Sequence, residues 1–383
     1  MRENIGIYIH IPFCFKKCYY CDFVSYENKE DIIEDYIDSL CIEILKNSEI
    51  LSEYNISTIY FGGGTPSFIS SKYIIKIMNI LKLFMPDTNF LKEVTIEVNP
   101  NSTSLEKLID YYNCGINRLS IGLQSTHDKI LRNIGRSHTF KDFKNTLENA
   151  KKAGFTNLSI DLIYPLPGLN VTSFKDCLNS LMKLKNEYDI KHISIYNLEV
   201  HENTRLSFLL KEGFVSLCNE DEEYEMRKEL NYILEKNNYK KYEISNYAIP
   251  GFESKHNLCY WNQDKYLGFG VNASSFFNQK RYSNIKDINK YIYSIKNNLS
   301  IISETEELDK LDLMKEYVIL KLRLKSGINK KDFNDKFNIN IYDIFKEEIS
   351  SLKKDNLIKE DNEKIFLSDR GEEVANIVWE MFV

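Results

Sequence analysis

Short apolar runs alternate with longer amphipathic segments along the first 200 of the 383 residues. The apolar runs have strand length, and the segments between them repeat apolar positions with a helical period. This alternation predicts an α/β fold with a parallel sheet built from βα units. The expected strands are residues 5–11, 56–61, 93–99, 117–122, 157–163 and 192–198, with helices such as 31–46 and 140–153 between them.

Six βα units are too few to close an eight-stranded barrel. The count therefore favours an open, partial (βα)6 barrel of the TIM type, in which chemistry gathers at the carboxyl ends of the strands. The first domain is expected to span residues 1–210, and a less regular extension residues 211–300. In that extension we expect a helix at 221–236 and strands at 241–247 and 269–275.

The pattern changes again in the last 80 residues. Helices are predicted at 308–324, 330–337 and 342–355, then a strand pair at 357–360 and 364–367, and a final helix at 370–382. This order is typical of a winged-helix-like α+β module, which we assign to residues 301–383. Such modules often bind DNA, but lysine and glutamate are mixed here without a basic stripe, so a docking or lid role is favoured.

Composition narrows the class of protein. The chain is 43% hydrophobic and 28% charged with a net charge of −6, which is ordinary for a globular protein and gives no reason to expect nucleic acid. Outside one cluster the eight cysteines are scattered, which favours reduced thiols and a cytoplasmic location over a disulfide framework. We expect no signal peptide and no membrane helix.

The clustered cysteines are Cys14, Cys18 and Cys21, spaced C-x3-C-x2-C directly after the first strand. Three thiolates on one loop suit three irons of a [4Fe–4S] cluster and leave the fourth iron open to an exogenous ligand such as S-adenosylmethionine. The alternatives are a zinc site or three unrelated thiols. Structural zinc sites usually combine two close ligand pairs, whereas this loop offers one triplet and no partner pair.

Polar and glycine residues follow the next strands. Gly62, Gly63 and Gly64 come after the second strand, where they allow either close approach of a ligand or only a tight turn. Glu97 ends the third strand, where its carboxylate can accept hydrogen bonds from ribose hydroxyls or an ammonium group, or remain a solvated charge. Three further candidates, each with an alternative as a polar strand-end group, are Gln124, Arg136 and Asp161.

The cysteine triplet resembles the signature of the radical S-adenosylmethionine superfamily. The lead-in YIHIPFC at residues 8–14 and the order of the later motifs resemble one branch of it, which holds oxygen-independent coproporphyrinogen III oxidases and HemW heme chaperones. The resemblance covers nearly the whole chain. It implies a first S-adenosylmethionine site beside the cluster, lined by Tyr8, Gly63 and Glu97. Five further residues match positions that hold a second S-adenosylmethionine molecule in the oxidase, and in this chain they are expected to bind either that molecule or another ligand. These residues are Gly64, Thr65, Gln124, Arg136 and Asp161.

Three features separate the two relatives. The oxidase has a further cysteine two residues after the triplet, where this chain has Phe23, and it carries a long extension before the position of Tyr8. The segment HNLCYW at residues 256–261 matches the HNxxYW motif associated with HemW. All three features favour the chaperone over the oxidase.

The HNLCYW segment offers an imidazole at His256, a thiol at Cys259 and two flat aromatic rings, which suit a porphyrin and its iron. Its alternative is a purely structural segment. We therefore expect a heme chaperone with His256 as a candidate heme ligand, which binds heme, a [4Fe–4S] cluster and S-adenosylmethionine and passes heme to an acceptor protein. The alternatives are an enzyme, the oxygen-independent coproporphyrinogen III oxidase, and a regulatory heme or redox sensor. The expected assembly is a monomer or dimer, with only peripheral contact to a membrane-bound acceptor.

Overall fold

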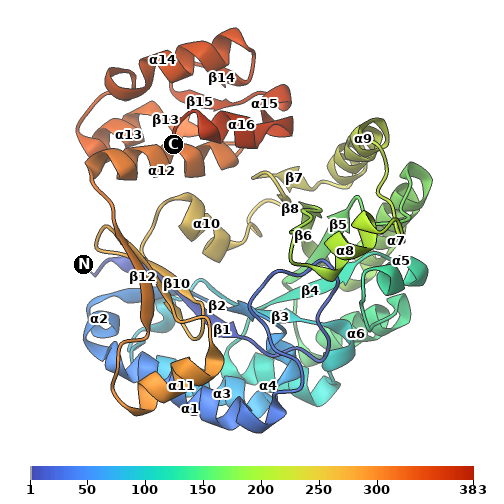
Figure 1. Ribbon diagram of the computed structural model, residues 1–383, viewed down its shortest axis with the longest axis vertical. Helices are drawn as coiled ribbons and strands as arrows, with labels where there is room; N and C mark the ends of the chain where they lie inside the picture. Colours follow the sequence, from blue (N-terminus) through green and yellow to red (C-terminus); the bar gives the residue numbers. More distant parts are fainter. Residues whose placement is uncertain (1) are drawn as a thin grey trace.

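The computed structural model describes residues 2–383, which form a large mixed α/β fold (Figure 1). At its centre, six parallel strands are hydrogen-bonded in sequence order, and all six predicted strands are confirmed. They are β1 (Asn4–Ile11), β2 (Asn55–Gly63), β3 (Glu93–Val98), β4 (Arg118–Gln124), β5 (Leu158–Tyr164) and β6 (Ile190–Asn197). The helices between them are α1 (Ile33–Lys46), α2 (Ser48–Glu53), α3 (Ser71–Lys82), α4 (Leu105–Cys114), α5 (Asp128–Asn133), α6 (Phe140–Ala153) and α7 (Val171–Tyr188).

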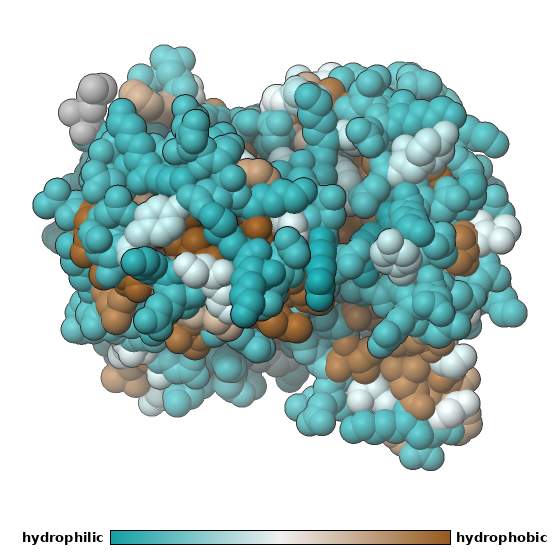
Figure 2. All heavy atoms as spheres, turned by 90° about the horizontal axis from the view of Figure 1, so that it is seen from above, coloured by the Kyte–Doolittle hydropathy of each residue, from teal (hydrophilic) through white to brown (hydrophobic). Residues whose placement is uncertain are grey.

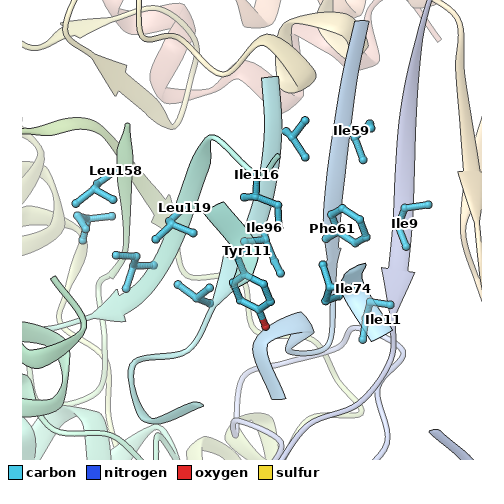
Figure 3. Close-up of a cluster of buried hydrophobic side chains, with 14 of the residues drawn as sticks. Ile9, Ile11, Ile59, Phe61, Ile74, Ile96, Tyr111, Ile116, Leu119 and Leu158 are labelled. Carbon is cyan, nitrogen blue, oxygen red and sulfur yellow. The ribbon is translucent and has the colours of Figure 1, made fainter. Parts of the chain in front are cut away.

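The two faces of these strands differ in chemistry because successive side chains point to opposite sides. One face is aliphatic and packs against the helices, as Figure 3 shows for Ile9, Ile59, Ile96 and Leu119. The other face carries polar groups at the intervening positions, and these groups bond one another across neighbouring strands. Ser120 on β4, for example, donates a hydrogen bond to Asp161 on β5. The sheet therefore holds its core on one side and its chemistry on the other.

Local signals explain where the helices begin and end. Thr139 and Asp142 form a capping box at the start of α6, and the left-handed Gly154 ends it. Asn170 and Ser173 form the same arrangement at the start of α7. Each such cap supplies hydrogen bonds to backbone N–H groups that the helix itself leaves unpaired, and stabilises it by about 1 kcal/mol.

Further strands extend the sheet at both edges. Beyond β6 lie β8 (Asn246–Ala248) and β7 (Lys240–Lys241), so the strand predicted at 241–247 is in fact two short strands. Beyond β1 lie β9 (Tyr266–Phe269), β10 (Ser274–Phe277), β11 (Lys280–Asn284) and β12 (Ile302–Glu307). The prediction of one strand at 269–275 was wrong, because Gly270 and Asn272 adopt positive φ and turn the chain between β9 and β10. The helices of this region are α8 (Arg205–Lys211), α9 (Glu220–Lys236), α10 (Lys255–Trp261) and α11 (Ile288–Lys296).

The C-terminal residues form a separate hydrophobic cluster around Val318, Phe333 and Phe345. Five helices accompany a three-stranded antiparallel sheet of order β13-β15-β14. The final predicted helix, 370–382, is divided in two because Val374 leaves helical geometry. The elements are α12 (Lys310–Arg323), β13 (Ile328–Asn329), α13 (Lys330–Phe337), α14 (Ile341–Lys354), β14 (Ile358–Glu360), β15 (Lys364–Leu367), α15 (Asp369–Glu373) and α16 (Ala375–Glu380).

This C-terminal module rests on α10 (Figure 1). The Arg323 guanidinium of α12 lies 4.3 Å from the ring centre of Trp261 and 4.8 Å from that of Trp379. Lys321 adds a hydrogen bond to the side chain of Asn262. A cation between two indole rings is a favourable contact, worth about 1–2 kcal/mol when partly desolvated.

The outer surface is mainly hydrophilic on the face shown in Figure 2, with hydrophobic patches of limited extent. Within residues 2–383, no helix has both the length and the apolar character needed to cross a bilayer.

A buried carboxylate joins α1 to the strands added beside β1. Glu43 accepts hydrogen bonds from the backbone N–H of Gly270, the side-chain amide of Asn284 and the hydroxyl of Tyr291. Burial raises the pKa of Glu43 to about 7, although these three donors act in the opposite direction. The charged carboxylate is therefore costly in the folded chain despite its hydrogen bonds.

We expect this raised pKa to make stability fall with increasing pH. The ordinary pKa of a glutamate, 4.5, applies to the unfolded chain, so the folded chain binds an extra proton from about pH 4.5 to pH 7. The raised pKa therefore contributes about 3 kcal/mol to the free energy of unfolding at low pH, and this contribution is lost as the pH rises through about 7. Glu43→Gln should flatten the free energy of unfolding across this range, whereas the exposed Glu49→Gln should not. Equal slopes in Glu43→Gln and the unmodified chain would contradict the assignment.

Candidate cofactor site at the carboxyl ends of the strands

The cysteine loop begins where β1 ends and is held by the glycine run that ends β2. The backbone N–H of Gly64 donates to the carbonyl of Ile11, and that of Thr65 donates to the carbonyl of Phe13. A Cβ at residue 64 would lie 2.9 Å from the carbonyl oxygen of Phe13, so only glycine allows this approach. The glycine run therefore fixes the point at which the cysteine loop leaves the sheet.

The three thiols of the loop lie among polar partners. The Sγ of Cys14 is 3.4 Å from the hydroxyl oxygen of Thr65, and Arg136 donates from Nη1 to the Sγ of Cys18 at 3.4 Å. Burial raises the pKa of Cys14 and raises that of Cys21 to about 11. All eight cysteines, each within the described residues, are free. Binding of a metal or cluster to these thiols must therefore displace protons.

The surroundings of these thiols fit an iron–sulfur cluster. Across residues 2–383, no three His, Cys, Asp or Glu side chains are arranged to hold one metal ion. A [4Fe–4S] cluster needs a different geometry, since each thiolate binds a different iron. Arg136 brings a buried cation to Cys18, and its Nε has no hydrogen-bond partner. A positive group at that position favours anionic sulfur.

A cavity of about 400 Å³ opens beside the glycine run. Its lining includes Tyr8, Gly63 and Glu97 from the strands and Tyr260 and Trp261 from α10. Gly63 has a φ of +112°, and a Cβ there would lie 2.7 Å from the His10 ring. The structure thus brings together the three residues expected to line the first S-adenosylmethionine site.

Glu97 is a buried carboxylate of this cavity, which Asp264 and Arg281 also line. It accepts a hydrogen bond of 2.9 Å from the hydroxyl of Tyr60. Burial raises its pKa to about 7, and the nearby charge of Asp161 acts in the same direction. A ligand that brings an ammonium or hydroxyl group to Glu97 would stabilise the carboxylate.

The five residues expected at a second ligand position divide into two groups. Gly64 and Thr65 lie against the cysteine loop, as described above. Arg136 donates to the carbonyl of Gly122 at 2.6 Å, and a Cβ at Gly122 would lie 2.9 Å from Arg136 and 3.0 Å from Gln124. The Oε1 of Gln124 is buried and has no partner, whereas Asp161 already accepts from Ser120. Arg136 and Gln124 are therefore the pair left with unused polar atoms.

His256 is enclosed by protein groups. Its side chain is 1% exposed on α10, with Nδ1 2.8 Å from the hydroxyl of Thr58 and Nε2 2.7 Å from that of Tyr260. Burial lowers its pKa to about 3, so the ring is neutral. Both ring nitrogens are thus bonded to protein hydroxyls, so iron can bind one of them only after Thr58 or Tyr260 moves. Cys259 is also buried, and heme ligation by His256 stays a prediction.

Three residues of the polar face were not predicted as site residues. His10 lines the cavity and holds the cysteine loop, with Nε2 3.0 Å from the carbonyl of Val24. Tyr60 orients Glu97, and the fully buried Arg118 compensates the charges of Glu93 and Asp161. His10 stands two positions from Tyr8 on β1, Tyr60 stands two positions from Gly62 of the glycine run, and Arg118 lies on the same face of β4 as Gln124. Same-face spacing was the signal that could have identified them.

Comparison with known proteins agrees with this arrangement. Residues 8–181 match the family described as the radical SAM superfamily, and residues 308–372 match the HemN C-terminal domain. The chain is 35% identical to the heme chaperone HemW of Lactococcus lactis subsp. lactis over 100% of its own length and 98% of that protein. It is 32% identical to the heme chaperone HemW of Bacillus subtilis over 98% of both proteins.

The chain belongs to the HemW family. Its fold is also similar to that of coproporphyrinogen III oxidase (HemN) from Escherichia coli, a radical SAM enzyme, with a TM-score of 0.85 at 22% identity. That alignment covers 100% of this chain and 90% of the oxidase. The likeness confirms the α/β fold with a large parallel sheet, while family membership rests on the HemW proteins.

We expect cluster binding in this HemW-family chain to depend on the loop thiols alone. Cys18→Ala should abolish stable [4Fe–4S] binding, because one iron loses its ligand and Arg136 loses its anionic neighbour. Cys218→Ala, outside the loop, should retain a full cluster. Iron and sulfide content after anaerobic reconstitution distinguishes the two variants, and a full cluster in Cys18→Ala would contradict the assignment.

Gly63 tests the cavity beside the glycine run. Gly63→Ala places a Cβ 2.7 Å from His10, so the ring or the backbone must move into the ligand space, and S-adenosylmethionine affinity should fall roughly tenfold. Gly251→Ala is the matched control, because Gly251 also has positive φ but no atom within 4 Å of its added Cβ. Calorimetry on cluster-loaded protein should show unchanged affinity in the control. Equal affinity in both variants would remove Gly63 from the site.

Proposed function

We propose that this chain is a heme chaperone that binds heme, a [4Fe–4S] cluster and S-adenosylmethionine and transfers heme to an acceptor protein. One observation carries the proposal: the match to the heme chaperone HemW of L. lactis runs through the whole chain at 35% identity. The cavity beside the cysteine loop, with its glycine run and carboxylate, supports the cofactor part of the proposal.

Each cofactor has a proposed set of residues. Cys14, Cys18 and Cys21 would hold the cluster, which when bound supplies an iron with an open coordination position. Tyr8 and Glu97 would orient S-adenosylmethionine, with the backbone of Gly63 close to its amino group. A second set of residues would bind another ligand or a second molecule of S-adenosylmethionine, and within it Arg136 and Gln124 have buried polar atoms without a partner. The members of this set are Gly64, Thr65, Gln124, Arg136 and Asp161.

The alternative function is the oxidative decarboxylation of coproporphyrinogen III. The fold is compatible with it, since the oxidase from E. coli shares that fold. The position two residues after the triplet is Phe23, whose side chain is 64% exposed and lines the cavity. No thiol is available there, so this chain lacks a group on which we expect the oxidase to depend.

We further propose the finer architecture. The six βα units would form an open, partial barrel over residues 1–210, and residues 301–383 a winged-helix-like module. The separate hydrophobic cluster of the C-terminal elements, whose buried residues begin at Met314, supports such a module, while β12 pairs with β11 in the large sheet. Residues 211–300 would be the extension, since they add strands to both edges of the sheet. We place the protein in the cytoplasm as a monomer or dimer, with peripheral contact to any membrane-bound acceptor.

Two measurements test the function together. Heme added to the reconstituted protein should bind stoichiometrically, with optical and EPR spectra that report heme and cluster separately. Incubation with coproporphyrinogen III, S-adenosylmethionine and reductant should give no protoporphyrinogen, with the E. coli oxidase as the positive control. Protoporphyrinogen formed by this chain, or an absence of heme binding, would overturn the proposal.

A further inference from the structure

The C-terminal module forms part of the wall of the cavity beside the glycine run. Leu320 of α12 lines this cavity together with Trp261 of α10 and Arg281 of β11. Gly63 and Glu97 line the same cavity from the ends of β2 and β3. Ligand cavities in proteins often lie between two domains, and here a ligand at Gly63 and Glu97 shares its cavity with a residue of the module.

Polar side chains make the contacts between α12 and the rest of this wall. Gln263, which follows α10, donates from Nε2 to the carbonyl of Leu313 at 3.0 Å. The Nη2 of Arg281 lies 2.9 Å from a carboxylate oxygen of Glu316. The buried hydrophobic residues of the module form their own cluster, separate from that of the large sheet. Polar interfaces of this kind between two hydrophobic cores allow one domain to move relative to the other.

Buried polar atoms that have no hydrogen-bond partner among residues 2–383 gather at this interface. Three of them belong to residues that line the cavity, namely Trp261 Nε1, Gln263 Oε1 and Arg281 Nε. On the module, Arg323 Nε and Trp379 Nε1 are unpaired in the same way. Each of these atoms gives up its hydrogen bonds with water when the interface is closed, so its hydration favours an open arrangement.

The backbone attaches the module to the rest of the chain at both ends of α12. Residues 308–309 connect β12 to the start of this helix. Just beyond its other end, the backbone N–H of Lys325 donates to the carbonyl of Tyr242 at 3.0 Å. Rotation of the module about the axis of α12 can therefore break the side-chain contacts with α10 and β11 while both attachments remain. Three ion pairs also join the module to the segments beside β6, and they are Lys241–Glu372, Arg227–Glu373 and Arg323–Glu243.

We propose that the C-terminal module is a movable cover of this cavity, which turns about α12 to admit S-adenosylmethionine and then closes over it. The inference rests on the proposed position of the cofactor at Gly63 and Glu97, and it adds the route by which the cofactor reaches that position. A bound ligand brings polar atoms to the unpaired groups of Trp261, Gln263 and Arg281. Binding therefore favours the closed arrangement over the open one.

Stopped-flow measurement of S-adenosylmethionine binding to the full-length, cluster-loaded protein tests the cover. Glu316→Ala removes the carboxylate that pairs with Arg281, and Glu316 lies outside the lining of the cavity. Loss of this contact should favour opening, so the association and dissociation rate constants should both rise roughly fivefold while their ratio, the affinity, stays the same. Unchanged rate constants, or a rise in the dissociation rate constant alone, would overturn the inference.

Glu360→Ala is the matched control for this experiment. It removes ion pairs with Lys330 and Lys353, which both belong to the module, so both rate constants should equal those of the unmodified chain. Lys321→Ala removes the hydrogen bond to Asn262 of the α10 segment and should act like Glu316→Ala. This second variant decides the question if Glu316→Ala does not fold.

The two tryptophans of the chain report the position of the module directly, because Trp261 and Trp379 both contact Arg323. Fluorine NMR of protein that carries fluorotryptophan resolves the two rings, and Trp379→Phe assigns them. Saturating S-adenosylmethionine should shift the Trp379 resonance, although Trp379 lies outside the lining of the cavity. A resonance that does not respond would contradict closure. If Gly63→Ala binds S-adenosylmethionine as the unmodified chain does, the proposed cofactor position fails, whereas weakened binding in Gly63→Ala with unchanged rate constants in Glu316→Ala and Lys321→Ala defeats the cover alone.

Discussion

Side-chain alternation along six parallel strands decides where the chemical groups of this chain lie. Aliphatic side chains at every second position pack against the helices, and the positions between them must then face the opposite side. A shift of one residue in any strand would move its polar groups into the core and its aliphatic groups into the cavity. The register of the sheet therefore also determines which residues line the site.

The polar face is stable because its groups are paired with one another. Tyr60 bonds Glu97, Ser120 bonds Asp161 and Ser159 contacts His192, so desolvated polar atoms are compensated across strands. Glu93 extends this pairing to α10 by accepting from the backbone N–H groups of Lys255 and His256. The histidine of the HNLCYW segment is thus part of the support that fixes α10 over the strands.

The sequence was sufficient where a local pattern determines the structure. The six strands follow from apolar runs, and the cysteine triplet and glycine run are recognisable from spacing alone. The sequence was insufficient where the structure of a segment depends on contacts with residues far away in the chain or on an unusual backbone angle. The role of His256 depends on Thr58, almost 200 positions earlier, and the break between β9 and β10 depends on an asparagine that adopts positive φ. A motif read along the chain cannot show which partner will occupy its polar atoms.

The pairing of β1 with β9 joins two neighbouring strands of the large sheet that lie far apart in the sequence. β1 pairs with β2 on one side and with β9, which begins at residue 266, on the other. In addition, the Tyr36 hydroxyl donates a hydrogen bond to the carbonyl of His10 and accepts one from the backbone N–H of Val271. Contacts of such sequence separation form late in folding. During synthesis, the strand that carries the cysteine loop must therefore remain half-paired until about two-thirds of the chain has left the ribosome. The nascent protein completes the seat of its iron–sulfur loop only after β9 has been made, which favours loading of the cofactor late in synthesis or after it.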